Sequence, residues 1–180
     1  GGDTFYAAGR LGELITSTNG STWTSPVNSG VGYIGLGEEK SGIIDTDGSK
    51  YYAPSFGWGI VESATFGTSW TSEANTLRAD TEVRGIIHDG TRFVGFGIQG
   101  LSLAQSTDGL TWSGISDNLP SHTFKSIAYD STNYIAGGDA GNLLTSTNLT
   151  SWTSLTSGTS EAIRHVNYLG STYLYITSGG

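Results

Sequence analysis

Short apolar runs alternate with clusters of turn-forming residues along the whole chain. Between positions 83 and 115 the pattern predicts four strands, over Val83–His88, Arg92–Ile98, Leu101–Gln105 and Thr111–Ile115. Asp-Gly or Asp-Ser separates the first strand from the second in three such units, and Asp-Gly between apolar runs is a strong hairpin signal. We therefore predict repeated units of four short antiparallel strands joined by tight turns.

Four similar segments, 17–23, 64–70, 106–112 and 146–152, each end in a tryptophan and align without gaps. The four tryptophans lie 47, 42 and 40 residues apart, which is the period of a four-stranded propeller blade. In a propeller, sheets are arranged radially and bury both faces against their neighbours. The predicted fold class is all-β, a β-propeller of four-stranded antiparallel blades. A β-sandwich is the alternative, but it does not require so regular a period.

We interpret residues 1–180 as a single propeller domain or segment. The repeats span about 1–27, 28–74, 75–116 and 117–156, with a partial repeat at 157–180. The first repeat lacks its first strand, and the last repeat stops before its tryptophan segment. Four blades with a spare strand and five blades with one incomplete are both compatible with this pattern. We expect the sequence to be a window on a larger protein.

The segment Ser106-Thr-Asp-Gly-Leu-Thr-Trp112 resembles the Asp box, or bacterial neuraminidase repeat. The resemblance implies a hairpin between the third and fourth strands of a blade, with the Asp side chain tying the turn and the indole ring buried between sheets. Because Phe66 and Leu149 depart from the motif, we expect looser turns in the second and fourth boxes. The structural residues that the resemblance indicates are Asn19, Gly20, Trp23, Gly67, Trp70, Asp108, Gly109, Trp112, Asn148 and Trp152.

Composition narrows the possible partners. The chain carries a net charge of -8, so phosphate backbones are repelled and no nucleic-acid partner is predicted. It has no apolar run near the roughly 18 residues that a spanning helix needs, so we predict no membrane span. Cysteine is absent, which removes disulfides, thiolate metal sites and thiol nucleophiles.

We predict no catalytic activity. Sialidases with Asp boxes also need three clustered arginines, a Tyr-Glu pair and an acid/base Asp, whereas the five arginines of this chain fall, in our interpretation, at different repeat phases. The histidines lack a metal-binding spacing, and the Asp-Gly pairs are explained by hairpin turns, so we predict neither a metal nor another cofactor. The arginines are Arg10, Arg78, Arg84, Arg92 and Arg164.

Four residues are candidates for contact with a partner. Trp58 interrupts the repeat, and contact competes there with local packing. Glu82, His122 and Glu161 stand where innermost strands are predicted to begin, around one mouth of the central channel, although solvated loop residues give the same pattern.

The function predicted from these features is a non-catalytic interaction module. Its composition resembles propeller-like segments of phage virion proteins, such as tail fibres or capsid decorations, which places it in a virion or outside the cell. Other protein subunits or a surface glycan would be its partners. One alternative is a secreted bacterial lectin-like domain that binds sugars through Trp58, and a third is a fragment of a sialidase-like glycosidase.

Overall fold

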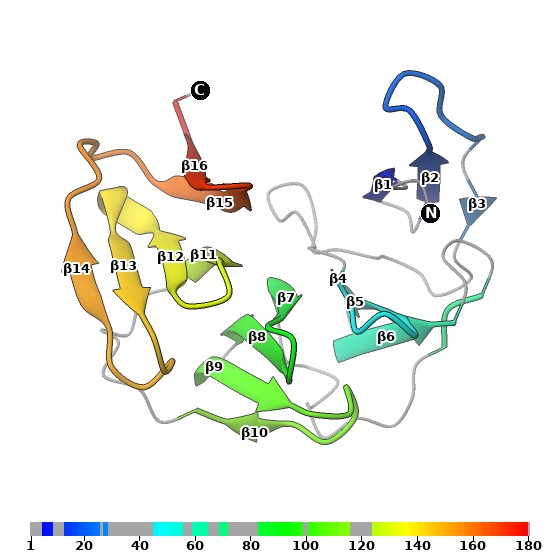
Figure 1. Cartoon of the computed structure of the whole chain (residues 1–180), viewed down its shortest axis with the longest axis horizontal. Helices are drawn as coiled ribbons and strands as arrows, with labels where there is room; N and C mark the ends of the chain where they lie inside the picture. Colours follow the sequence, from blue (N-terminus) through cyan, green and yellow to red (C-terminus); the bar gives the residue numbers. More distant parts are fainter. Residues whose placement is uncertain are drawn as a thin grey trace.

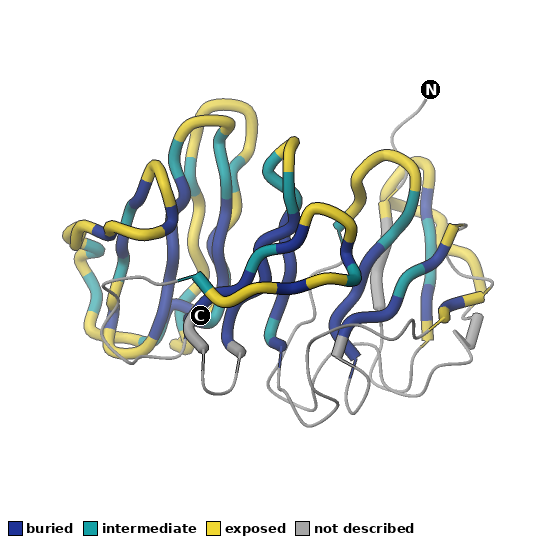
Figure 2. The backbone as a smooth tube through the Cα atoms, turned by 90° about the horizontal axis from the view of Figure 1, so that it is seen from below, coloured by how far each residue is buried: buried dark blue, intermediate teal, exposed yellow. Residues whose placement is uncertain are grey.

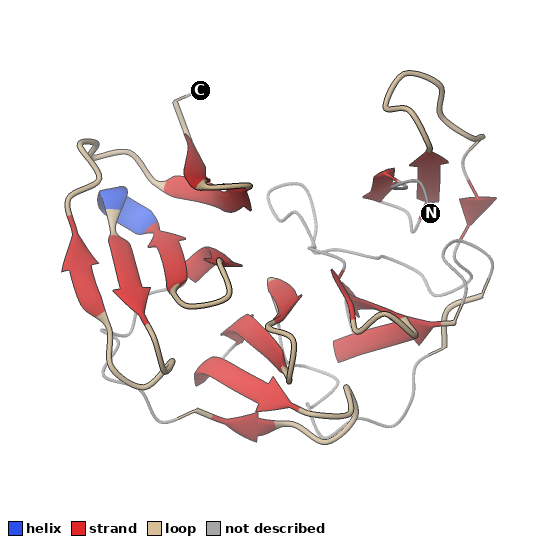
Figure 3. Cartoon of the chain, viewed as in Figure 1, coloured by secondary structure: helices blue, strands red, loops and turns tan. Residues whose placement is uncertain are grey.

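The computed structural model describes residues 5–8, 13–25, 27–28, 45–55, 59–64, 69–71, 83–98, 101–115 and 124–179. These residues form sixteen β-strands and one short 3-10 helix, η1 at Asp139–Gly141, and no α-helix occurs among them (Figure 3). The predicted all-β class is confirmed.

The strands form five antiparallel sheets in which neighbours in sequence are neighbours in space. Two sheets have four strands, β7 (Gly85–His88) to β10 (Ser113–Gly114) through β8 (Phe93–Ile98) and β9 (Leu101–Ser106), and β11 (Phe124–Tyr129) to β14 (Thr153–Leu155) through β12 (Tyr134–Gly138) and β13 (Leu143–Ser146). The other sheets are β1 (Phe5–Ala8), β2 (Glu13–Ser17) and β3 (Val27–Asn28); β4 (Asp45–Thr46), β5 (Tyr51–Ser55) and β6 (Gly59–Ser63); and β15 (Ile163–Leu169) with β16 (Thr172–Thr177).

The strand register repeats from sheet to sheet. A buried serine on a third strand lies opposite an aromatic residue on the second strand in four of the sheets. The pairs are Ser17 with Phe5, Ser63 with Tyr51, Ser106 with Phe93, and Ser146 with Tyr134. Strands β1 and β2 are thus the second and third strands of their repeat.

The five sheets follow one another along an arc, with β4, β7, β11 and β15 nearest its centre and β10 and β14 at its outer edge (Figure 1). Seen from the side, the buried residues run through the middle of the strands while the hairpin turns are exposed (Figure 2). This radial arrangement of antiparallel sheets is that of a β-propeller and not that of a sandwich of two layers.

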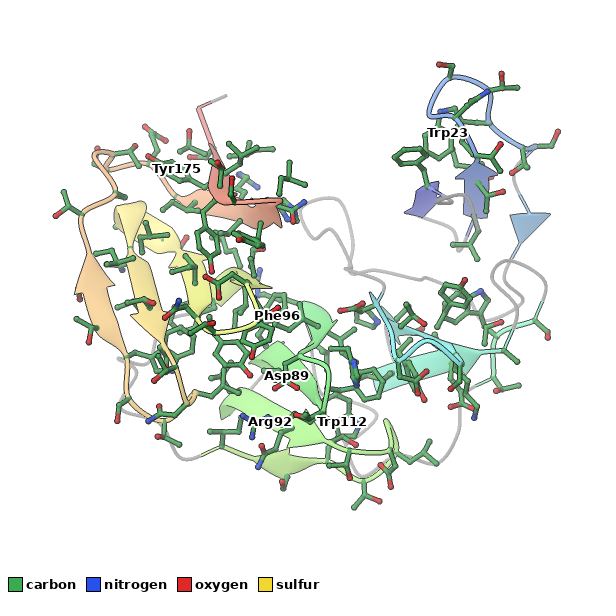
Figure 4. All side chains as sticks on the ribbon, viewed as in Figure 1. Trp23, Asp89, Arg92, Phe96, Trp112 and Tyr175 are labelled. Atoms are coloured by element: carbon green, nitrogen blue, oxygen red, sulfur yellow. The ribbon has the colours of Figure 1, made fainter. Side chains whose placement is uncertain are left out.

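Four hydrophobic clusters hold the arc together, and each joins two consecutive sheets. Leu14 of β2 packs with Val61 and Trp70 of the next sheet, and Tyr52 of β5 packs with Phe93 and Trp112 of the one after it. Phe96 of β8 lies between its own sheet and the β11–β14 sheet, where it packs with Trp152 and Leu144 (Figure 4). Ile135 of β12 packs with Val166 of β15. Each inner sheet therefore buries both of its faces.

The arc has two edges. The turns between first and second strands and those between third and fourth strands share one edge, because antiparallel hairpins alternate in direction, and we call this edge the turn face. The innermost strands begin at the other edge, which also carries η1 and which we call the opposite face.

Candidate functional site

The turns between third and fourth strands, whose sequences resemble Asp boxes, are closed by their own polar groups. Asp108 Oδ1 accepts hydrogen bonds from the backbone N–H groups of Leu110 (2.8 Å) and Thr111 (2.7 Å) and from Ser106 Oγ (2.9 Å). The bonds from Thr111 and Leu110 hold the pKa of the Asp108 carboxyl well below its usual range. Trp112 Nε1 donates to the carbonyl of Gly109 at 2.8 Å. The polar groups of the motif thus find their hydrogen-bond partners within the turn, and the motif stabilises the fold.

The first and fourth boxes have the same geometry with asparagine in place of Asp108. Asn148 Oδ1 accepts from the backbone N–H groups of Thr150 (3.0 Å) and Ser151 (2.9 Å), and Asn19 makes the equivalent bonds at 2.8 and 2.9 Å. The expectation of a looser fourth turn is wrong. Leu149 adopts a φ of 67°, in the left-handed region that glycine favours, and its fully buried side chain offsets that strain by packing between sheets.

Three of the four box tryptophans are buried, and one is not. Trp70, Trp112 and Trp152 are 4%, 7% and 8% exposed, whereas Trp23 is 40% exposed. Each buried ring contacts the preceding sheet of the arc, but the described residues include no sheet before β1–β3, so Trp23 lies at the end of the arc (Figure 4). The expectation that all four rings lie between sheets is corrected for Trp23.

Carboxylates in the turns after the first strands are also occupied by structural contacts. Asp89 Oδ1 accepts from the backbone of Thr91 and Arg92, while its Oδ2 accepts from Arg92 Nε (3.0 Å) and from Tyr134 Oη of the next sheet (2.5 Å). Asp47 caps its own turn in the same way and also accepts from Tyr52 Oη. In the part of the chain that the structure describes, no group of three His, Asp or Glu side chains is placed to hold a metal ion.

At the opposite face, the innermost strands carry a repeated basic residue. The pairing of β11 with β12 skips Lys125, and that of β15 with β16 skips Arg164, so both residues occupy β-bulges. Arg84 stands at the same position before β7, where its N–H donates to the carbonyl of Phe96. The three residues share one repeat phase, so two of the five arginines, Arg84 and Arg164, coincide in phase, while Arg92 precedes a second strand.

The three cations differ in their surroundings. The Arg84 stem lies over Gly97, where an added Cβ would overlap it, and Arg84 Nε is buried without a hydrogen-bond partner among the described residues. Lys125 Nζ lies 3.0 Å from Asp139 Oδ1 of η1, and Arg164 is exposed. An alignment of the repeats would have found these three residues. Each stands five residues before a turn position, which is occupied by Asp89, Asp130 or Leu169.

Of the residues predicted to contact a partner, the structure places Glu161. It is exposed, lies just before β15 at the opposite face, and its Oε2 accepts a hydrogen bond from Ser178 Oγ at 2.6 Å. It therefore lies on the same edge as Arg164. Trp58, Glu82, His122 and the box residue Gly67 lie outside the described residues.

Within the described ranges, no helix has the length and apolar character to cross a membrane.

Neither a protein-family model nor a curated protein matches the sequence. Solved structures do match its fold. YCF48 bound to D1 peptide aligns with 98% of this chain at a TM-score of 0.66 and 18% identity. A chain of a nidogen/laminin complex aligns with 98% of this chain at a TM-score of 0.72 and 16% identity. The WD40 β-propeller domain of Doa1 aligns with 97% at a TM-score of 0.65 and 10% identity.

The chain spans 58% of the YCF48 chain, 68% of the matched chain of the nidogen/laminin complex and 58% of the Doa1 chain. At these identities the likeness concerns the fold alone. The architecture of the sheets and these likenesses together show that the chain has a β-propeller fold.

Proposed function

We propose that the chain is a non-catalytic interaction module whose rigid sheets present their edges to a protein partner. The observation that carries the proposal is the use of the repeated motif residues in packing. Asp108, Asn148 and Asp89 are committed to turns, and Trp112 and Trp152 to the core between sheets. The recurring side chains therefore build a scaffold, and binding falls to positions at the edges of the strands.

The partner that this arrangement suits is a polypeptide. Two of the solved propellers with the same fold are described by such contacts, one as bound to D1 peptide and one as part of a nidogen/laminin complex. By composition, the place we propose for this chain is a phage virion, as a tail-fibre or capsid-decoration segment. The low charged fraction of 13% is the compositional feature that supports this structural role.

Immunogold electron microscopy of virions from the source of this sequence tests the proposal. Antibodies against the 180-residue chain should label purified particles at the tail or capsid surface. Label in the culture supernatant but not on particles would overturn the virion role. Specific binding on a glycan array that is lost in Trp58→Ala would then favour the lectin-like alternative, while turnover of fluorogenic sialosides by the full-length protein would contradict the non-catalytic assignment.

A further inference from the structure

We propose that Arg84, Lys125 and Arg164 form a binding site for carboxylates of an acidic segment in the partner polypeptide. The inference rests on the proposed function and names the edge that makes the contact, the opposite face. It assigns a role to three positively charged side chains that the scaffold does not need for its turns or for its core.

The first argument is their position. The chain has only eight lysines and arginines against sixteen acidic residues, yet three of the eight occupy one repeat phase on three consecutive innermost strands. Strands β7, β11 and β15 are successive neighbours around the centre of the arc (Figure 1). A bulge re-aims the side chain of its extra residue and interrupts pairing, and bulges are common beside binding sites. The three residues therefore stand at the same edge of three neighbouring sheets, Lys125 and Arg164 in bulges and Arg84 just before β7.

A second and independent observation concerns Arg84. Its Nε is buried and has no hydrogen-bond partner among the described residues, and burying a donor of a charged group without a partner is costly. A carboxylate bound at the opposite face would relieve this cost when the Arg84 side chain turns outward and donates to it. Arginine presents its donors in a planar fork that suits carboxylates, so Arg84 and Arg164 have the geometry for paired hydrogen bonds.

The described carboxylates nearby leave this site positive. Asp139 is the only acidic partner of Lys125 in the described residues, and its side chain is 52% exposed, so an incoming carboxylate can compete for the ammonium group through a solvent-screened pair. Glu161 keeps its charge while it accepts a hydrogen bond from Ser178 Oγ, so the three cations exceed the two described carboxylates, Asp139 and Glu161, by one charge. Arg164 is exposed and has no ion pair within the described part of the chain.

The overall charge selects among anions. A net charge of -8 repels a long polyanion such as nucleic acid. In physiological salt this repulsion acts over about 8 Å. A short acidic stretch of a folded or extended polypeptide reaches the three cations without bringing many further charges. Such a segment is therefore a better fit than a phosphate polymer.

The test uses the 180-residue chain and three probes, the peptides Ac-Glu-Glu-Glu-NH2 and Ac-Gln-Gln-Gln-NH2 and inorganic sulfate, at matched ionic strength. Binding is followed by amide chemical shifts in two-dimensional NMR. The triglutamate should produce saturable shifts at the start of β7, β11 and β15, and the glutamine peptide should not. Arg164→Gln should weaken triglutamate binding by about tenfold or more, which corresponds to one charge-assisted contact.

Two further variants keep the outcome clear. Lys50→Gln removes one positive charge on the turn face, where Lys50 pairs with Glu62. It should leave triglutamate affinity within about twofold of wild type, because salt screens a charge on the other edge of the arc. Lys125→Gln should weaken it as Arg164→Gln does. Equal losses in Lys50→Gln and Arg164→Gln, saturation by sulfate but not by triglutamate, or no saturable shifts would each overturn the site. Particle labelling by antibodies does not depend on this result. A failure of the binding site can therefore be told apart from a failure of the proposed function.

Discussion

Tyr134 Oη donates a hydrogen bond of 2.5 Å to Asp89 Oδ2 and thereby ties the second strand of one sheet to the turn of the preceding sheet. The next sheet repeats the contact in altered form, since Tyr173 Oη donates to the carbonyl of Asn133 at 3.2 Å. Burial opposes ionisation of Asp89, but the bonds from Tyr134, Thr91 and Arg92 outweigh it and lower the pKa of its carboxyl. The hydrophobic clusters between sheets are therefore supplemented by a polar link at the turn face.

Removing the hydroxyl of this link should weaken the protein. We expect Tyr134→Phe to lower the free energy of unfolding by about 1 to 3 kcal/mol, because the bond reaches an ionised and largely buried carboxylate. Tyr129→Phe is the matched control, since its ring stacks on Tyr134 but its hydroxyl bonds to none of the described residues. Chemical denaturation measures both, and equal losses in the two variants would contradict the link.

Acid should destabilise the fold for the same reason. The pKa of Asp47 is lowered to about 2, because bonds from the backbone of Lys50 and from Ser49 outweigh desolvation, and that of Asp89 is lowered as well. A carboxyl whose pKa is lower in the folded state contributes stability above its unfolded pKa of about 3.9, and this stability is lost as the pH falls. Asp45, whose pKa is raised by burial, acts in the opposite sense.

The melting temperature should therefore drop as the pH is lowered from about 5 to about 2.5, and the drop should be shallower in Tyr134→Phe because the pKa of Asp89 returns toward its ordinary value. Thermal denaturation at several pH values checks this. A melting temperature that is constant or rises over this range would show that the turn carboxylates do not stabilise the fold.

The left-handed residues of two turns should respond in opposite directions to glycine. Ser131 is exposed with a φ of 78°, so Ser131→Gly should stabilise the protein by about 0.5 to 1 kcal/mol through relief of strain. Leu149 has a similar φ but is fully buried, and Leu149→Gly should destabilise by about 1 to 4 kcal/mol, because the lost packing exceeds the relieved strain. Denaturant unfolding of both variants gives the sign, and stabilisation by Leu149→Gly would contradict the packing role.

Periodicity along the chain was sufficient to predict the radial sheets. The tryptophan spacing fixed the repeat, and the Asp-Gly pairs fixed the first hairpin of each unit, so predicted strands such as Arg92–Ile98 nearly coincide with observed ones such as Phe93–Ile98. These features are local or periodic, and short-range sterics and hydrogen bonding determine them.

The remaining features depend on partners that a sequence does not reveal. Trp23 has the same motif as Trp112, and only the place of its sheet at the end of the arc decides its exposure. Leu149 breaks the turn rule and is tolerated because a neighbouring sheet covers it. The common phase of Arg84, Lys125 and Arg164 is present in the sequence spacing, but only the strand pairing shows that Lys125 and Arg164 occupy bulges.

The last sheet should promote self-association. Leu174 and Ile176 of β16 are 51% and 59% exposed, yet their equivalents on β8, Val94 and Phe96, are fully buried against the next sheet. Exposed apolar faces of this kind associate. The double variant Leu174→Thr/Ile176→Thr should reduce concentration-dependent association in sedimentation velocity.

The same double variant should change the free energy of unfolding by only about 0.5 kcal/mol, as surface substitutions do. Val94→Thr, at the equivalent buried position, should destabilise by about 1 to 3 kcal/mol because it places a hydroxyl in the core. If the wild-type chain is monomeric at all concentrations, the exposed face of β16 does not behave as an unpaired half of an interface between sheets.

Solvent access to the indole rings tests the radial packing of sheets most directly. In the chain labelled with 5-fluorotryptophan, with signals assigned from single Trp→Phe variants, a soluble paramagnetic chelate is titrated while fluorine NMR line widths are recorded. We predict strong broadening for Trp23 and protection of Trp70, Trp112 and Trp152, because only the latter three are covered by a preceding sheet. The fifth signal, from Trp58, serves no part of the test. Equal broadening of the signals from Trp23, Trp70, Trp112 and Trp152 would contradict the packing of the last three rings between blades.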